Sequence, residues 1–250
     1  MRVEVQNLVV ERGATRAVDH VGFVAESGRW IGVIGANGSG KTSLLRAVAG
    51  RLPSASGAII VDDEDRTADR AWRAASFGFA PDPAALPATL AGGEFLAILG
   101  SEAPGRADSD PLAPLRRALD FDRFLDRRIG TLSTGMKQRL AIFSAFVGRP
   151  GLVILDEPFN WLDPVCAFDT KEALRALVTG KGLALVTALH EMATLVHCCD
   201  AGVLLAGGRV SRRLDSADMR AGARNLAAFE AEMIRGLRAG VAVVSAARTA

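Results

Sequence analysis

The chain has 250 residues, and its 49% hydrophobic and 23% charged content is ordinary for a globular protein with a sizeable core. A formal net charge of +2 at pH 7 excludes a strongly basic nucleic-acid binder, so no nucleic-acid partner is expected. The most apolar long window, residues 183–208, is interrupted by His190, Glu191, His197 and Asp200 and is therefore not predicted to span a membrane.

The N-terminal part of the chain has the pattern of β-strands. Residues 2–10 and 16–25 are predicted to form two strands around a turn at Glu11, Arg12 and Gly13. A third strand is predicted over residues 30–34, which are apolar and β-prone. We therefore expect an antiparallel β unit ahead of this third strand.

A glycine-rich loop follows the third strand. Residues 35–42 read Gly-Ala-Asn-Gly-Ser-Gly-Lys-Thr, which fits the phosphate-binding pattern, and a helical run, residues 43–49, leaves the loop and stops at Gly50. Glycines let successive backbone N–H groups turn toward a polyphosphate, and the helix N-terminus adds partial positive charge. Lys41 is expected to reach the β- and γ-phosphates, and the Thr42 hydroxyl to bind Mg²⁺. The predicted nucleotide-binding residues here are Gly35, Ala36, Asn37, Gly38, Ser39, Gly40, Lys41, Thr42 and Ser43.

The middle of the chain changes character. A turn at residues 52–57 precedes a predicted strand at 58–61, and another strand is predicted at 75–79. Six prolines between residues 80 and 114 predict loops and short helices, and residues 115–125 return to helical spacing. We expect a helical subdomain at about 83–139.

A second site is predicted where residues 152–155, all apolar, are followed by Asp156 and Glu157. This pattern is typical of a buried parallel strand that delivers carboxylates at its carboxyl end, where ligands bind. Asp156 is expected to hold Mg²⁺ through coordinated water, and Glu157 to polarise the water that attacks the γ-phosphate.

Cysteine usage favours a reducing compartment. Cys166, Cys198 and Cys199 are an odd number that includes an adjacent pair, a poor basis for a disulfide framework. Cys198 and Cys199 with His190 and His197 match no standard zinc spacing, so burial of the thiols is preferred to metal binding. The first five residues alternate charged and β-branched types, so no signal peptide is expected.

These residues, with Leu-Ser-Thr-Gly-Met-Lys-Gln-Arg at 132–139 between them, resemble the nucleotide-binding domain of ABC-type ATPases over nearly the whole chain. The order of phosphate loop, signature, acidic strand, Asp163 and His190 carries the resemblance. It implies that Ser133 and Gly135 contact the ATP of a partner chain from the start of a helix. It also implies that Asn-Trp-Leu-Asp at 160–163, from Asn160 to Asp163, is the loop that communicates between two nucleotide sites, and that His190 contacts the γ-phosphate.

The resemblance implies an α/β fold: a P-loop NTPase core with an antiparallel β subdomain and an inserted α-helical subdomain, forming one ABC ATPase domain over residues 1–250. ATP and Mg²⁺ are the implied cofactors. The implied partners are a second ABC ATPase chain, paired head to tail, and a transmembrane permease subunit. The protein would then be cytoplasmic and peripheral to the inner face of the cell membrane.

Two positions depart from the family pattern. Arg12 stands where an aromatic residue usually stacks on adenine, and the chain has no tyrosine. A guanidinium can stack on a purine, but Arg12 can equally be a solvated turn residue. Asp82 stands where a glutamine usually links Mg²⁺ to the transport partner, and it is read either as a metal ligand, direct or through water, or as part of a proline-flanked turn.

Function follows from the same resemblance. Thr134 and Met136 are similar to the signature variant of exporters of the ABC-2 type, which favours an ATP-hydrolysing subunit that drives a membrane subunit in export. A soluble ABC ATPase in assembly, repair or regulation is the alternative, and a nucleotide-binding regulator with little turnover is the third reading. A terminal amphipathic helix is predicted at about 225–237, with residues 240–250 loosely held.

Overall fold

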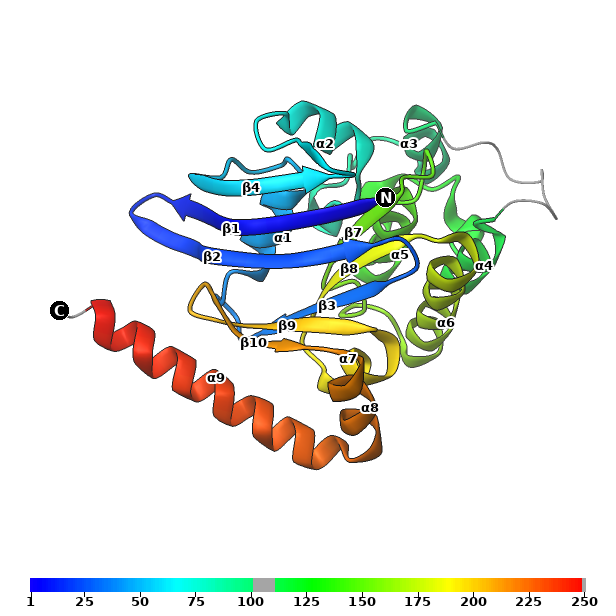
Figure 1. Ribbon diagram of the computed structural model, residues 1–250. Helices are drawn as coiled ribbons and strands as arrows, with labels where there is room; N and C mark the ends of the chain where they lie inside the picture. The colour runs from blue at the N-terminus through cyan, green and yellow to red at the C-terminus, as the bar shows by residue number, and fades with distance from the viewer. Residues whose placement is uncertain (101–110, 249–250) are drawn as a thin grey trace.

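The computed structural model describes residues 1–100 and 111–248 and contains two β-sheets (Figure 1). The smaller sheet is antiparallel, in the order β2-β1-β4-β5. Its strands are β1 (Arg2–Arg12), β2 (Thr15–Glu26), β4 (Ser56–Val61) and β5 (Glu64–Asp65). The predicted antiparallel β unit is confirmed, with the hairpin turn at Gly13 and Ala14, so that Arg12 ends β1.

The larger sheet has the order β10-β9-β3-β8-β7-β6, and its five strands from β9 to β6 are parallel. β10 is antiparallel to β9 at one edge. The strands are β3 (Trp30–Gly35), β6 (Gly78–Phe79), β7 (Leu152–Asp156), β8 (Ala184–Leu189), β9 (Ala201–Ala206) and β10 (Arg209–Leu214).

Each face of the larger sheet is buried in a different core, which explains its unbroken apolar strands. Leu152 and Ile154 of β7 face a core formed with the smaller sheet and with α1 (Lys41–Val48), which packs between the two sheets. Val153 and Leu155 face a core formed with helices on the other side. The α/β class is thereby confirmed.

The remaining helices cover the second face and the ends of the larger sheet (Figure 1). They are α2 (Arg70–Ser76), α3 (Gly92–Ile98), α4 (Ala113–Leu119), α5 (Thr134–Ser144), α6 (Pro164–Lys181), α7 (Met192–Cys198), α8 (Ser216–Arg224) and α9 (Leu226–Arg248). Short 3₁₀ helices lie at Pro83–Ala85, Asp122–Phe124 and Ile129–Thr131.

Two predicted elements were wrong in part. The strand predicted at 75–79 is only β6, because α2 runs to Ser76 after Asp69 caps its N-terminus by accepting a hydrogen bond of 3.0 Å from Trp72 N. The helix predicted at 115–125 ends at Leu119, because Asp120 adopts a left-handed conformation with φ of 42°.

The predicted helix boundaries at both ends of the chain also shift. α1 begins at Lys41 rather than at Ser43, which places Lys41 and Thr42 in its first turn. The terminal helix begins at Leu226, where Asn225 Oδ1 accepts a hydrogen bond from Ala228 N, and it continues to Arg248 instead of ending at 237. Of the loops expected over 80–114, residues 101–110 lie outside the described residues, as do 249–250 of the loosely held end.

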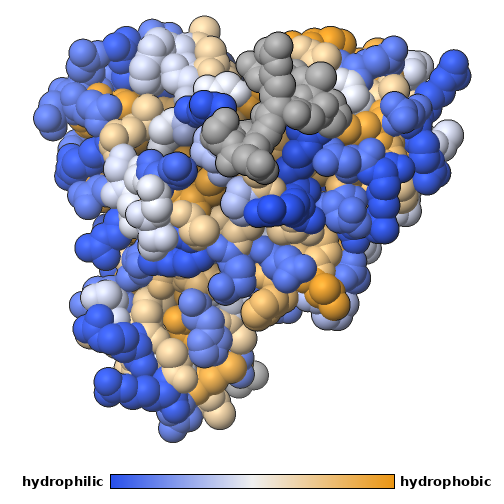
Figure 2. All heavy atoms as spheres, turned by 90° about the vertical axis from the view of Figure 1, so that its right-hand side faces the viewer, coloured by the Kyte–Doolittle hydropathy of each residue, from blue (hydrophilic) through white to orange (hydrophobic). Residues whose placement is uncertain are grey.

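Within residues 1–100 and 111–248, no helix is both long and apolar enough to cross a bilayer. The face shown in Figure 2 is mostly covered by hydrophilic side chains, with small apolar patches between them. The thiols of Cys166 and Cys199 are buried and Cys198 is partly buried, and burial raises the pKa of each of the three.

Candidate functional site

Four neighbouring strands of the larger sheet, β3, β8, β7 and β6, run in parallel and therefore end at one edge. The glycine-rich loop follows β3, His190 follows β8, Asp156 and Glu157 end β7, and Asp82 lies just after β6. Side chains that are far apart in the sequence meet at this edge because the strands that carry them are parallel. In sheets of this kind, ligands bind beyond the carboxyl ends of the strands.

The glycine-rich loop is tightly packed against its neighbours. Gly40 has φ of 104°, and a Cβ at this position would lie 2.3 Å from the carbonyl oxygen of Ala17, so no side chain fits there. Gly208 N donates a hydrogen bond of 3.0 Å to Ser39 O, which ties the loop to the turn between β9 and β10. The loop is thus held in a fixed shape before any ligand binds.

Lys41 lies inside the loop with only 4% of its side chain exposed. Its Nζ donates to Gly35 O at 2.8 Å and to Ala36 O at 3.3 Å. Burial lowers the pKa of Lys41, and the nearby charges of Glu157 and Asp156 oppose that shift. A buried ammonium aimed at the loop is suited to bind a phosphate oxygen.

Asp156 ends β7 in a partly buried position next to Thr42. Burial raises the pKa of Asp156, and a hydrogen bond from Thr42 opposes the rise. Asp156 Oδ1 and Ser39 Oγ are buried and have no hydrogen-bond partner among the described residues. Unsatisfied buried oxygens of this kind fit a ligand that brings its own partners, such as Mg²⁺ with a phosphate. Thr42 and Asp156 are the residues that would hold the ion.

Glu157 is held by three other groups. Its Oε1 lies 2.6 Å from His190 Nε2 and 3.8 Å from Lys41 Nζ, and its Oε2 accepts a hydrogen bond of 2.8 Å from Asn160 Nδ2. Glu157 has a backbone φ of 51°. This conformation is rare for residues other than glycine, and such residues cluster at functional sites. The structure thus brings the two predicted catalytic residues, Glu157 and His190, together.

Asp82 lies beside these residues and also accepts a hydrogen bond from the backbone. It lines a pocket of about 200 Å³ together with Thr42, Asp156 and Glu157. Its carboxylate also accepts a hydrogen bond of 2.9 Å from Ala84 N and caps the 3₁₀ helix that begins at Pro83. Both readings of Asp82, a residue near the metal and a turn residue, are therefore compatible with its position.

Asp82→Asn tests which of these readings is right. The amide retains an oxygen that can cap Ala84 N but removes the negative charge next to Asp156. If Asp82 assists cation binding, the Mg²⁺ concentration that half-saturates ATP turnover should rise about threefold to tenfold, because a charged ligand contributes about 1 kcal/mol more than a neutral one. An unchanged Mg²⁺ dependence with an unchanged melting temperature would leave Asp82 as a turn residue only.

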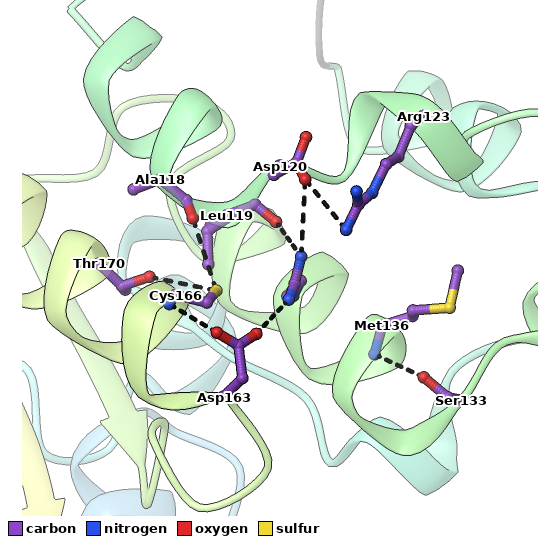
Figure 3. A network of polar contacts seen from close by, with 10 residues as sticks. Ala118, Leu119, Asp120, Arg123, Ser133, Met136, Asp163, Cys166 and Thr170 are labelled. Atoms are coloured by element: carbon purple, nitrogen blue, oxygen red, sulfur yellow. Dashed lines mark hydrogen bonds and ion pairs between the residues drawn. The ribbon is translucent and has the colours of Figure 1, made fainter.

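Ser133, Gly135 and Asp163 form a second group, and Figure 3 shows Ser133 and Asp163 with their neighbours. Ser133 caps α5 by accepting from Met136 N at 3.3 Å, and Asp163 caps α6 by accepting from Cys166 N at 3.0 Å. Both line a separate pocket of about 530 Å³, which contains no residue of the glycine-rich loop. Its remaining lining residues are Arg123, Phe124, Arg127, Gly135, Met136, Arg139 and Trp161.

Arg12 pairs with Thr15 at the end of β1, and its exposed side chain forms no hydrogen bond or ion pair within the described part of the chain. It lines neither of the two pockets.

The sequence did not predict any contact of Asn160, Gln138 or Arg139 with other residues of the site. In the structure, Asn160 donates a hydrogen bond directly to Glu157. The resemblance placed Asn160 in the loop between two nucleotide sites but did not predict its hydrogen bond to Glu157.

Comparisons with known proteins agree with this geometry. The ABC transporter family matches residues 18–160. The sulfate/thiosulfate import ATP-binding protein of Methylococcus capsulatus is 31% identical over 87% of this chain and 64% of its own length. An energy-coupling factor transporter ATP-binding protein of Streptococcus agalactiae is 32% identical over 77% of this chain and 70% of its own.

A solved structure of an ATP-binding subunit of an ABC transporter aligns with a TM-score of 0.78 at 28% identity, covering 94% of this chain and all of the other. Among the relatives compared by sequence, the Methylococcus protein is longer, and this chain spans less than two thirds of its length. The chain belongs to the ABC transporter family, as an ATP-binding cassette with an ATPase site of the P-loop type for ATP and Mg²⁺.

Proposed function

We propose that this chain binds and hydrolyses ATP in order to drive a separate membrane subunit, and that it works as a pair of such chains. The observation that carries the proposal is the convergence of Lys41, Asp156, Glu157 and His190 at one edge of the sheet. Loop amides and a buried ammonium bind phosphate, while an adjacent carboxylate accepts a proton, and these are the parts that phosphoryl transfer to water requires.

Each residue has a role set by its position. The loop amides and Lys41 hold the β- and γ-phosphates. Thr42 and Asp156 would hold Mg²⁺, which would neutralise charge on the transferred phosphoryl group. Glu157 orients the attacking water and accepts its proton through an oxygen that is within 2.6 Å of His190 Nε2. His190 fixes that carboxylate and is placed to contact the γ-phosphate.

The absence of phosphate-loop residues from the pocket of Ser133 and Gly135 supports pairing. Ser133 and Gly135 lie at the N-terminus of α5, where backbone N–H groups favour an anion, but their pocket shares no residue with the phosphate loop of the same chain. A second copy placed head to tail would bring its Ser133 and Gly135 to the nucleotide of the first. ATP would then hold two chains together, and its hydrolysis would release them.

A groove of about 860 Å³ supports a membrane partner. Asp82 lines both this groove and the pocket of Asp156 and Glu157, so a segment docked in the groove would contact a residue at the border of the catalytic site. Phe79, Phe95 and Leu99 give the groove an apolar part. We propose that a permease segment binds there.

We propose export as the direction of transport, on the signature variant with Thr134 and Met136. The Methylococcus relative, by contrast, is named as an importer. Inverted membrane vesicles separate the two directions, because an exporter accumulates its cargo inside them when ATP is added outside. The expected result is a solute that accumulates with the unaltered chain and does not with Lys41→Ala.

The coupling to a membrane subunit has a direct test. The tagged chain, purified from detergent-solubilised membranes of its own cell, should bring a multi-span membrane protein with it and should hydrolyse ATP. ATP turnover by a chain that remains in the soluble fraction with no membrane protein would instead support a role in assembly, repair or regulation.

A further inference from the structure

The turn between β9 and β10 lies against the phosphate loop. Gly207 and Gly208 form this two-residue turn with φ of 55° and 84°, a conformation that short hairpins favour and glycine adopts without strain. Gly208 N donates a hydrogen bond of 3.0 Å to Ser39 O, and a Cβ on Gly208 would lie 2.9 Å from Ala17 O. The turn is thus enclosed between the phosphate loop and β2. We call residues 207–209 the hairpin tip.

Asp19 of β2 holds the hairpin tip through both its backbone and its side chain. Its backbone N donates to Gly208 O at 2.7 Å, and its Oδ2 accepts from Arg209 Nε at 2.6 Å. Its Oδ1 accepts from Arg16 Nη1 at 3.1 Å and lies 2.8 Å from His20 Nδ1. Only 8% of Asp19 is exposed. Each oxygen of this buried carboxylate therefore has a hydrogen-bond partner.

Asp19 carries its negative charge at neutral pH. Burial raises the pKa of Asp19, but the hydrogen bonds from Arg209, His20 and Arg16 outweigh burial and lower the pKa to about 2. Hydrogen bonds between an arginine and a carboxylate are about twice as strong as those between neutral groups. The contact between Asp19 and Arg209 is therefore suited to fix the hairpin tip in one position.

We infer that Asp19 and Arg209 are positioning residues for the phosphate loop, because their ion pair holds the hairpin tip against Ser39. A loop that is ordered in advance binds a polyphosphate more tightly, since less binding free energy is lost in ordering it. Glu157 and His190 lie at the ends of other strands, β7 and β8, so turnover of bound ATP should not depend on this ion pair. The inference rests on the binding of Mg-ATP by the loop, which is part of the proposed function.

Arg209→Met tests the ion pair, because methionine keeps much of the aliphatic length and removes the donor to Asp19. We expect the Kd for Mg-ADP, measured by calorimetry, to rise about threefold to tenfold, because affinity falls in proportion to the population of the loop in its binding shape. Mg-ADP is the probe because it fills the loop without the γ-phosphate that is proposed to hold two chains together.

Arg213→Met is the matched control. Arg213 also joins β10 to β2, by donating to Gly22 O at 3.2 Å, but it lies four residues farther along β10 than Arg209. Its loss removes a similar link between the same two strands away from the hairpin tip. The Kd for Mg-ADP should therefore stay at the unaltered value.

Asp19→Asn separates positioning from the attraction of charges. If only the local field mattered, losing the negative charge of Asp19 should strengthen the binding of an anion, and losing the positive charge of Arg209 should weaken it. If the ion pair positions the loop, both substitutions weaken binding, and the double variant is no weaker than the weaker single variant, because both act through one contact. Effects of opposite sign, or effects that multiply in the double variant, would overturn the inference.

A role in folding alone gives a different result. It would lower the melting temperature of Asp19→Asn and Arg209→Met but leave the Kd for Mg-ADP unchanged, and the inference would then be wrong. We expect instead that KM for ATP rises with the Kd while kcat at saturating ATP stays within about twofold, because the lost interaction serves binding and not the chemical step. If the unaltered chain binds neither Mg-ADP nor Mg-ATP, the proposed function fails instead.

Discussion

Replacing Glu157 with glutamine should abolish turnover while leaving ATP bound. The amide has nearly the same shape as the carboxylate but cannot accept the proton of the attacking water, so kcat should fall by about 10²–10⁴-fold. Lys41 and the loop amides are untouched, so ATP should still bind. Because ATP is proposed to hold two chains together, Glu157→Gln should convert from monomer to dimer when ATP is added, as measured by light scattering after gel filtration.

The matched control is Glu172→Gln, which makes the same change at an exposed position of α6. It should hydrolyse ATP at the unaltered rate and should not accumulate as a dimer. A Glu157→Gln chain that retains turnover would show that another group activates the water. One that loses turnover and stays monomeric with ATP bound would contradict the proposed pairing.

The phosphate loop and the acidic end of β7 were predictable because their signals are local. Glycines, lysine and threonine within eight residues define the loop, and an unbroken apolar strand ending in two acids defines the position of Asp156 and Glu157. The parallel order of the strands then brings the two together. The family resemblance pointed to His190, which follows β8 and lies beside Glu157.

Features that depend on contacts between distant segments could not be predicted. No sequence pattern specifies the left-handed conformation of Glu157 or its hydrogen bond from Asn160, in a segment whose Pro158 O accepts a hydrogen bond from Gln138 of α5. β6 has only two residues, because α2 runs to Ser76 and only Gly78 and Phe79 pair with β7. α2 was missed because a short helix fixed by a single cap has no strong hydrophobic period.

Arg73 shows how a residue with no sequence signal can support the site. Its side chain is fully buried, and its guanidinium donates to backbone carbonyls only: Val48 O at 3.1 Å, Ala47 O at 3.3 Å, Thr67 O at 2.7 Å and Arg66 O. Burial lowers the pKa of Arg73. Two of the acceptors belong to the C-terminal end of α1, whose carbonyls carry partial negative charge, and Ala47 O also accepts from Gly50 N at 3.1 Å. Arg73 therefore anchors the helix whose first turn holds Lys41 and Thr42.

Arg73→Met should lower the free energy of unfolding by about 3 kcal/mol, because methionine retains most of the buried volume but leaves several buried carbonyls without a donor. Urea denaturation followed by fluorescence measures this loss, and Arg70→Met is the control. Arg70 lies on the same helix but is exposed and donates only to Gly50 O, so its loss should cost less than about 1 kcal/mol. Equal stability of the two variants would mean that water or local rearrangement satisfies the carbonyls, and that α1 does not depend on Arg73.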